Sequence, residues 1–266
     1  MDDLATNRAH WDSLARVHGQ DAYYDAAALV AGEDVLGDVE SAAVGDVAGL
    51  DVLHVQSHIA FDSICLARRG ARVTCVDFSA DSLAKARQLA DRCGVSLTLV
   101  EADAMALPAS LDGRFDLVYA AMGVLSWISD IDAWFAGAVR ALRPGGRFAL
   151  AELHPLFTAV ESVEPLRLDF PYAFDGPRRF DLPGSYADEG AAVEATATVE
   201  YAHSLGEIVT AAVSAGLHVD ALYEHLDAAI DGRGGVLGQE ADGRYRLRIG
   251  GEPLPVLFTL LASKPA

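Results

Sequence analysis

Side chains that could do chemistry stand directly after apolar runs of strand length. Asp77 ends the β-branched run 72–77, Asp103 follows the run 96–100, and His154 follows a third such run. In open α/β sheets, ligands bind at the carboxyl ends of the parallel strands. An acid at such an end can accept hydrogen bonds from hydroxyl groups, and a histidine can accept a proton near neutral pH, since its ordinary pKa is about 6.5. His154 is therefore a candidate base or substrate ligand, with a strand-end cap as the alternative.

The stretch that positions the first of these acids is residues 51–77. Residues 51–56 form a short apolar run typical of a buried parallel strand, residues 61–69 carry apolar side chains at helical spacing, and Gly70 ends that helix. Asp77 follows 21 positions after Gln56, which is the usual offset of about 20 between a cofactor loop and an acid that binds ribose. The pattern predicts a βαβ unit that binds a nucleotide-type ligand.

The loop between this strand and this helix lacks the glycines of a dinucleotide site. A pyrophosphate needs backbone amides at very short range, which is why glycines recur in such loops. Here the corresponding residues are Gln56, His58 and Ala60, and no phosphate-binding Gly-Lys-Ser/Thr motif occurs anywhere in the chain. The missing glycines disfavour the function of a nicotinamide oxidoreductase. They favour a nucleoside without phosphates as the ligand.

Three later segments carry a specific resemblance. Residues 100–108, 115–119 and 142–148 resemble, in order and spacing, the class I S-adenosylmethionine (SAM) dependent methyltransferases. The first loop, His-Val-Gln-Ser-His-Ile-Ala at 54–60, is similar to a bacterial small-molecule branch that reads His-x-Gln-Cys-His-x-Gly; most members read Asp-x-Gly-x-Gly-x-Gly. The resemblance extends from about Asn7 to the C-terminus. Ser57 and Ala60 depart from the branch pattern, and the Ala60 methyl group stands where the family's chain passes the methionine part of the cofactor.

The resemblance implies SAM as cofactor, S-adenosylhomocysteine as product, and a set of binding residues. Asp77 would accept the ribose hydroxyls, Asp103 the adenine amino group, and the Ala104 amide would meet a ring nitrogen. A solvated loop aspartate is the competing interpretation of Asp103, and plain aromatic packing that of the N-terminal aromatic residues. The full set expected to contact the cofactor is Trp11, Tyr24, Gln56, Ser57, His58, Asp77, Phe78, Asp103, Ala104 and Ala120.

The acceptor side is expected around the loop after residues 117–121. Met122 and Trp127 in that loop, with Tyr186 from a later segment, are the predicted substrate contacts, and His154 and His203 are the candidate catalytic bases. No Asn/Asp-Pro-Pro-Tyr motif occurs, which argues against methylation of nucleic-acid bases. The first hypothesis is a methyltransferase that acts on N, O or C of a natural-product-like small molecule. The second is a SAM-binding cyclase or isomerase without transfer, in which SAM is a structural or electrostatic element.

The composition of the chain limits which classes of partner it can bind. The chain has 266 residues, 52% hydrophobic, and a formal net charge of −19, which disfavours a phosphate backbone as partner. No run of 18 apolar residues and no basic leader occurs, and three cysteines fall in predicted helix or strand. The histidines and cysteines lack paired metal-ligand spacing, so no metal is expected. We expect a cytoplasmic protein with a small-molecule substrate, no nucleic-acid or membrane partner, and a possible homo-oligomer.

These elements predict an α/β fold with a Rossmann-like, seven-stranded, mostly parallel sheet, helices on both faces, an antiparallel last strand and an inserted lid. One domain, 1–266, would comprise four parts: an N-terminal helical cap at 1–50, a SAM-binding core at 51–155, a lid at 156–200 and the C-terminal part of the sheet at 201–266. Within them we expect helices at 4–18 and 34–50, a hairpin from about 186 to 201, a strand near 244–247 and last strands at 217–225 and 254–262.

Overall fold

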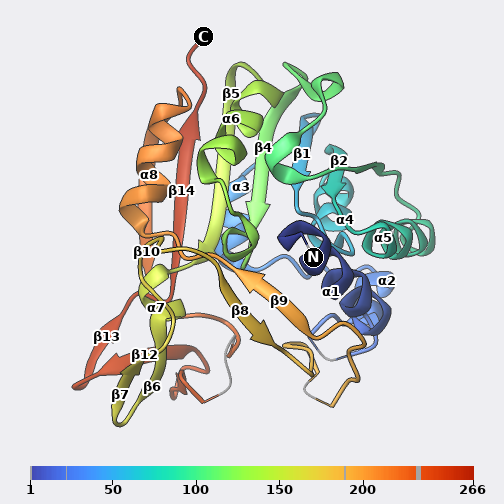
Figure 1. The fold of residues 1–266 in the computed structure, drawn as a ribbon. Coiled ribbons are helices and arrows are strands. Elements are labelled where there is room, and N and C mark those ends of the chain that lie inside the picture. The colour runs from blue at the N-terminus through green and yellow to red at the C-terminus, as the bar shows by residue number, and fades with distance from the viewer. Residues whose placement is uncertain (1, 22, 189, 232–234) are drawn as a thin grey trace.

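A seven-stranded sheet organises the chain. The computed structural model describes residues 2–21, 23–188, 190–231 and 235–266. The strands of the sheet lie in the order β10-β14-β5-β4-β1-β2-β3 (Figure 1). Their bounds are β1 Asp51–Val55, β2 Arg72–Asp77, β3 Thr98–Glu101, β4 Phe115–Ala121, β5 Leu142–Leu153, β10 His218–His225 and β14 Leu257–Ser263. Neighbours from β3 to β5 are parallel, whereas β14 runs antiparallel to both β5 and β10. The fold is the predicted Rossmann-like one.

Helices cover both faces of this sheet because its central strands are apolar on both sides. One face packs against α6 and α8, and the other against α2 to α5. The helices are α1 Asp3–Val17, α2 Ala26–Ala31, α3 Asp38–Val44, α4 Phe61–Arg68, α5 Ala80–Cys93, α6 Ile131–Ala141, α7 Pro155–Ala159 and α8 Leu205–Ser214, with short 3-10 turns η1 Ala104–Ala106, η2 Ala109–Leu111 and η3 Leu125–Trp127. No helix among the described residues is long and apolar enough to cross a membrane.

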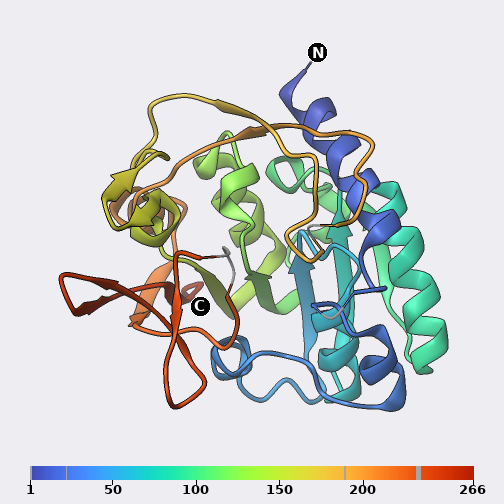
Figure 2. The same cartoon turned by 90° about the horizontal axis from the view of Figure 1, so that it is seen from below.

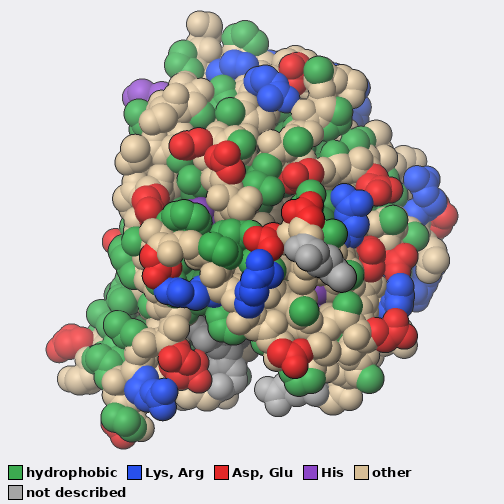
Figure 3. Space-filling view, in the orientation of Figure 1, with side chains coloured by type: hydrophobic (Ala, Val, Ile, Leu, Met, Phe, Trp, Pro, Cys, Tyr) green, Lys and Arg blue, Asp and Glu red, His purple; other side chains and the backbone are tan. Residues whose placement is uncertain are grey.

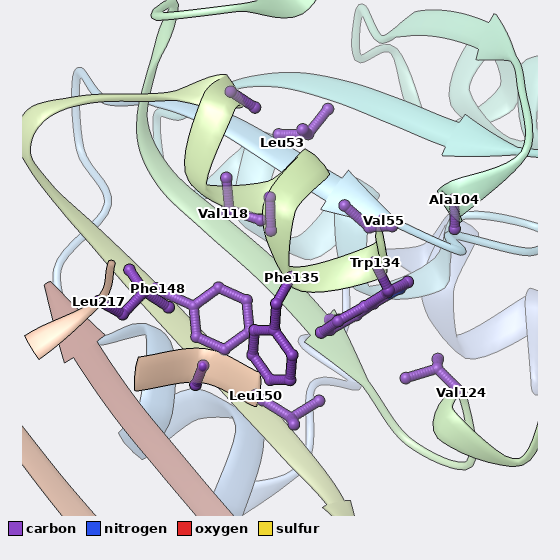
Figure 4. Close-up of a cluster of buried hydrophobic side chains, with 14 of the residues drawn as sticks. Leu53, Val55, Ala104, Val118, Val124, Trp134, Phe135, Phe148, Leu150 and Leu217 are labelled. Carbon is purple, nitrogen blue, oxygen red and sulfur yellow. The ribbon is translucent and has the colours of Figure 1, made fainter. Parts of the chain in front are cut away.

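An aromatic cluster fixes α6 to the sheet. Trp134 and Phe135 of α6 meet edge to face, with ring centroids 4.9 Å apart, and both pack on Phe148 of β5 (Figure 4). Such geometry adds to the free energy gained by burial. The indole Nε1 of Trp134 also donates to Oε1 of Gln56 at 2.9 Å, so the cluster reaches the loop that follows β1.

Two predicted elements are wrong in their bounds. The helix expected at 34–50 is only α3, Asp38–Val44, because Gly37 precedes it and Gly45, with φ of 62°, ends it. The hairpin expected at about 186–201 is instead formed by β8 Arg178–Asp181 and β9 Ala197–Glu200, joined by residues 182–196. A second hairpin, β6 Val160–Val163 with β7 Leu166–Leu168, precedes it. The strand expected near 244–247 is confirmed as β12 Tyr245–Ile249, between β11 Gly238–Gln239 and β13 Glu252–Leu254.

The described part of the segment 156–200 passes over the carboxyl end of the sheet to reach α1. Seen from below, its gold and orange course runs from α7 across to the N-terminal helix (Figure 2). The side chain of Asn7 in α1 bonds both backbone groups of Val199 in β9, donating at 2.7 Å and accepting at 2.8 Å. Asp3 adds an ion pair with Arg179 of β8 and accepts from the Tyr201 hydroxyl. Helix α1 and the β8–β9 hairpin therefore form one cover over the strand ends.

Candidate cofactor and acceptor site

The loop after β1 has the backbone shape that glycines usually permit. Gln56, His58 and Ala60 all lie in the left-handed region, with φ of 58°, 47° and 64°. That conformation costs an L-residue about 1 to 2 kcal/mol, because its Cβ approaches a carbonyl oxygen. The Gln56 side chain holds the loop from inside, since its Nε2 donates to the Val124 carbonyl at 3.0 Å and its Oε1 accepts from Trp134. Three residues other than glycine thus hold a backbone shape that glycine adopts more readily.

Asp77 lies buried under this loop at the end of β2. Its Oδ2 accepts from the His58 amide at 2.8 Å and its Oδ1 from the Ser79 amide at 2.9 Å. Burial raises the pKa of this carboxyl to about 6, against the opposing effect of those amides. Each carboxylate oxygen has about two acceptor positions, so one on each oxygen remains for a ligand hydroxyl. Asp77 thus ends the second strand, as the sequence predicted, and its contact with ribose hydroxyls stays a prediction.

The His58 side chain belongs to a chain of hydrogen bonds. Its Nδ1 bonds the Ser82 hydroxyl of α5 at 3.0 Å, and its Nε2 bonds Nδ1 of His18 at 2.7 Å. The Nε2 of His18 continues to the Ser185 hydroxyl at 2.7 Å. Burial lowers the pKa of His18 to about 4 and that of His58 well below its ordinary value. Two neutral rings therefore connect the loop after β1 to the segment 156–200.

Three buried polar atoms in or beside residues 54–60 have no hydrogen-bond partner within the described part of the chain. They are Nε1 of Trp11, Nε2 of His54 and the hydroxyl of Ser57. Trp11 packs edge to face on His58 at 5.0 Å between ring centroids. A buried polar atom without a partner costs about 1 to 3 kcal/mol, which a ligand could relieve. With the spare capacity of Asp77, these atoms fit a nucleoside cofactor such as SAM, which would supply an electrophilic methyl group at a sulfonium.

The other predicted cofactor residues lie at neighbouring strand ends. Asp103 accepts from the Met105 amide at 2.9 Å and so caps η1, where Ala104 is buried. Ala120 is fully buried within β4, and Phe78 is half-buried after β2. Tyr24 joins the aromatic group near His58 by donating to, or accepting from, the Tyr186 hydroxyl at 2.6 Å.

Glu152 holds the loop that follows β4. This carboxylate, buried at the end of β5, accepts from the backbone amides of Gly123, Val124, Leu125 and Leu153. Burial raises its pKa although all four amides favour the charged form. Sequence reasoning missed Glu152, since a glutamate inside an apolar run carries no motif. It fixes the residues that lead to Trp127.

The two candidate bases differ in how they are held. The Nδ1 of His154 accepts from the Leu156 amide at 3.1 Å and caps α7, while its Nε2 lies 2.9 Å from a Glu224 carboxylate oxygen, at ion-pair distance but outside hydrogen-bond alignment. Burial lowers its pKa, and Glu224 opposes that shift. His203 instead donates from Nε2 to the Ile128 carbonyl at 2.7 Å, which leaves Nδ1 as an acceptor, and burial lowers its pKa as well. His203, unlike His154, lines a small cavity beside Glu152.

A larger cavity opens between α1, η3 and residues 182–186. Its volume is about 410 Å³, and its walls include Leu14, Trp127 and Tyr186. Met122, the third predicted substrate contact, does not line it and packs against the cluster around Phe157. His10 lines the cavity. It was not predicted from the sequence as a site residue, because a single histidine on a helix usually indicates packing against the core. Among the described residues no cluster of metal-binding side chains occurs.

The central part of the chain is similar to a known family of domains. Residues 52–146 match the model of a methyltransferase domain. A curated relative, demethylmenaquinone methyltransferase of Thermus thermophilus, is 40% identical over 86 residues, which are 32% of this chain and 38% of the relative. The chain thus matches less than half the length of that relative. Residues 52–146 are thus similar to a methyltransferase domain.

Solved structures extend the likeness of the fold over more of the chain. A SAM-dependent methyltransferase from Mesorhizobium loti superposes with a TM-score of 0.61 at 20% identity, covering 88% of this chain and 100% of that one. The cyclase SpnF superposes with a TM-score of 0.56 at 19% identity, covering 88% and 82%. At these identities the likeness concerns the fold, which is therefore shared by methyltransferases and by a cyclase.

Proposed function

We propose that this protein is a SAM-dependent methyltransferase that acts on a small molecule. The observation that carries the proposal is the arrangement at the carboxyl end of β1 and β2. There a buried carboxylate with spare acceptor capacity, Asp77, lies under a loop of glycine-like shape. Beside it, the buried donor of Trp11 has no partner among the residues that the structure describes. The methyltransferase domain match spans the same strands.

The charge and the cover support a small substrate rather than a macromolecule. On the face seen in Figure 3, basic side chains occur in separate groups among acidic ones and form no continuous stripe. The net charge of −19 points the same way, since nucleic-acid affinity relies on basic patches. The cover of α1 with the β8–β9 hairpin bounds a cavity of small-molecule size, about 410 Å³. The proposal includes a natural-product-like substrate and transfer of the methyl group to a nitrogen, oxygen or carbon atom of it.

Cofactor binding is the first test. Calorimetric titration with SAM and with S-adenosylhomocysteine should give saturable binding, and Asp77→Asn should weaken it about tenfold to a hundredfold, through the loss of one charge-assisted hydrogen-bond acceptor. Asp46→Asn, an exposed acid in the turn before β1, is the matched control and should bind normally. A folded Asp77→Asn variant with unchanged affinity would contradict the assignment.

Transfer itself is the second test, because the fold is shared with a cyclase. Incubation with methyl-labelled SAM and candidate small molecules should place the label in a product whose mass has risen by one methylene unit. A product isomeric with its substrate, formed without consumption of SAM, would favour the alternative of a SAM-binding cyclase or isomerase. Rates for His203→Ala and His154→Ala, measured from pH 5.5 to 9, test whether either ring acts as a base.

A further inference from the structure

The large cavity offers an apolar, aromatic surface and very little polarity. Of the described residues that line it, none carries a formal charge at neutral pH, and the walls include Leu14, Trp127, Leu182, Pro183 and Tyr186. A cavity of about 150 Å³ holds benzene, so the volume of about 410 Å³ suits two fused rings with substituents. Because a charged ligand would have to leave water without a counter-charge, an uncharged ligand is favoured here.

One histidine in this wall, His10, has a ring nitrogen that is available as a hydrogen-bond acceptor. The Nδ1 of His10 lies 2.7 Å from the Ala195 carbonyl, and a carbonyl only accepts, so Nδ1 carries the proton and Nε2 carries the lone pair. No hydrogen bond is made by Nε2 to any residue that the structure describes. Burial lowers the pKa of His10, which keeps the ring neutral at pH 7 and the lone pair available.

The neighbouring groups are engaged or serve as ring surfaces. The Ser185 hydroxyl bonds His18 at 2.7 Å, and the Tyr186 hydroxyl bonds that of Tyr24 at 2.6 Å. The Trp127 ring lies nearly parallel to His10, at 24° and 6.1 Å between centroids. A flat ligand against the Trp127 face would bring a ring substituent toward His10, since both side chains line the same cavity.

We propose that this cavity binds an uncharged, planar aromatic ligand of about two fused rings, whose hydroxyl group donates a hydrogen bond to Nε2 of His10. The inference rests on the proposed function in one respect, namely that the ligand is the methyl acceptor. In that role the O–H bond breaks with its electron pair left on oxygen, and the proton forms an N–H bond with the Nε2 lone pair. The products of this step are an aryl oxide and an imidazolium, so charge and protons balance. His10 is thus assigned as a ligand-binding residue and proton acceptor.

The experiment titrates three naphthalene probes into the intact protein and follows binding by ligand-observed NMR. The probes are 2-naphthol, naphthalene and (2-naphthyl)trimethylammonium, which share one ring system and differ in hydroxyl and charge. We expect 2-naphthol to bind roughly tenfold tighter than naphthalene, the factor expected for one hydrogen bond, and the cation to bind weakest. Tightest binding of the cation would overturn the proposal, since an aromatic wall also suits cation–π contacts.

Two variants assign the effect to this cavity. His10→Asn keeps an amide N–H for the Ala195 carbonyl but has no atom at Nε2, so it should bind naphthalene as before and lose the tenfold preference for 2-naphthol. Leu14→Trp fills the cavity and should abolish binding of both neutral probes. His218→Asn, an exposed site on β10, is the matched control and should keep the preference. A preference that survives His10→Asn, or binding that survives Leu14→Trp, would overturn the proposal; if one of the two variants does not fold, the other decides the assignment.

A SAM titration on the same samples separates this inference from the proposed function. Probe binding without SAM binding would leave the cavity assignment intact and remove the methyltransferase. SAM binding and transfer without probe binding would remove the cavity assignment alone.

Discussion

The two halves of the carboxyl edge of the sheet use their buried acids in opposite ways. At the end of β2, Asp77 accepts hydrogen bonds from two amides and keeps acceptor positions free. The nearby Trp11 and Ser57 have buried polar atoms without partners in the described part of the chain. At the end of β5, Glu152 accepts four amides. Burial of an acid therefore does not by itself mark a ligand site. The acid at the end of β2 can still bind a ligand, whereas the acid at the end of β5 holds the loop that follows β4 in place.

Removal of Glu152 should have the largest effect on stability. Glu152→Ala leaves several buried amides of residues 123–125 without a partner, at about 1 to 3 kcal/mol each, so the free energy of unfolding should fall by about 3 kcal/mol or more. Asp130→Ala, which removes an exposed cap that accepts from one amide, should cost only about 1 kcal/mol. Urea denaturation of both variants measures the difference. Equal losses of unfolding free energy in the two variants would mean that the hydrogen bonds to Glu152 stabilise the fold no more than one helix cap does.

The pH dependence of Asp77 should be the next largest effect. Its pKa is raised from the ordinary value near 3.8 to about 6, so the folded state holds this proton more tightly than the unfolded state. The contribution to stability is therefore present below about pH 4 and is lost as pH rises to 6, by about 3 kcal/mol at 1.36 kcal/mol per unit.

Asp77→Asn lacks that titration. Between pH 4 and 6, stability of the variant should therefore rise relative to the wild type, as measured by urea denaturation at pH 4, 5 and 6. Saturating SAM is expected to add more stability to the wild type than to the variant at pH 7.5. A pH profile shared by both proteins would show that the buried carboxyl is not destabilising.

His154 should behave as part of the frame. His154→Ala removes the cap of α7, which is worth about 0.5 to 2 kcal/mol, and should leave turnover within a fewfold of normal. Because burial lowers its pKa, this side chain contributes stability above the unfolded pKa of about 6.5 and loses it as pH falls. A drop in turnover of about a hundredfold with normal stability would instead make His154 the base predicted from the sequence.

The smallest effect should come from the loop after β1. Ala60→Gly relieves the left-handed conformation, worth about 1 to 2 kcal/mol, but loses a buried methyl group and gains unfolded-state entropy, about 0.8 and 0.5 to 1 kcal/mol. Stability should thus change by less than about 0.8 kcal/mol in either direction. Ala86→Gly, buried within α5 with no such strain to relieve, should cost about 1 to 2 kcal/mol. A similar loss at both positions would mean that the loop is unstrained. Calorimetry should show several-fold tighter SAM binding for Ala60→Gly if its methyl group stands against the cofactor.

The sequence predicted what local pattern specifies. Apolar runs gave the strands around Asp77, and the acid at the strand end followed from the order of the elements. The hairpin β8–β9 was misplaced because all four residues of β8 are exposed, so no alternation marks the strand, and its partner lies across the 15-residue loop 182–196. His10 was missed because its role depends on the carbonyl of Ala195, 185 positions away. The left-handed conformation of the loop after β1 could not be predicted, because Gln56, His58 and Ala60 are not residue types that favour it.

The position of β14 has a consequence for the order in which the molecule folds. β14 lies between β5 and β10, so β5 keeps an open edge until residues from about a hundred positions later dock against it. Closing so long a loop is entropically costly before the pairing contributes, which slows folding. During that interval the long apolar strand β5 presents unpaired N–H and C=O groups, which are a template for intermolecular pairing. Refolding yield should therefore fall with protein concentration, and substitutions that destabilise β14 should promote aggregation before they reduce ligand binding.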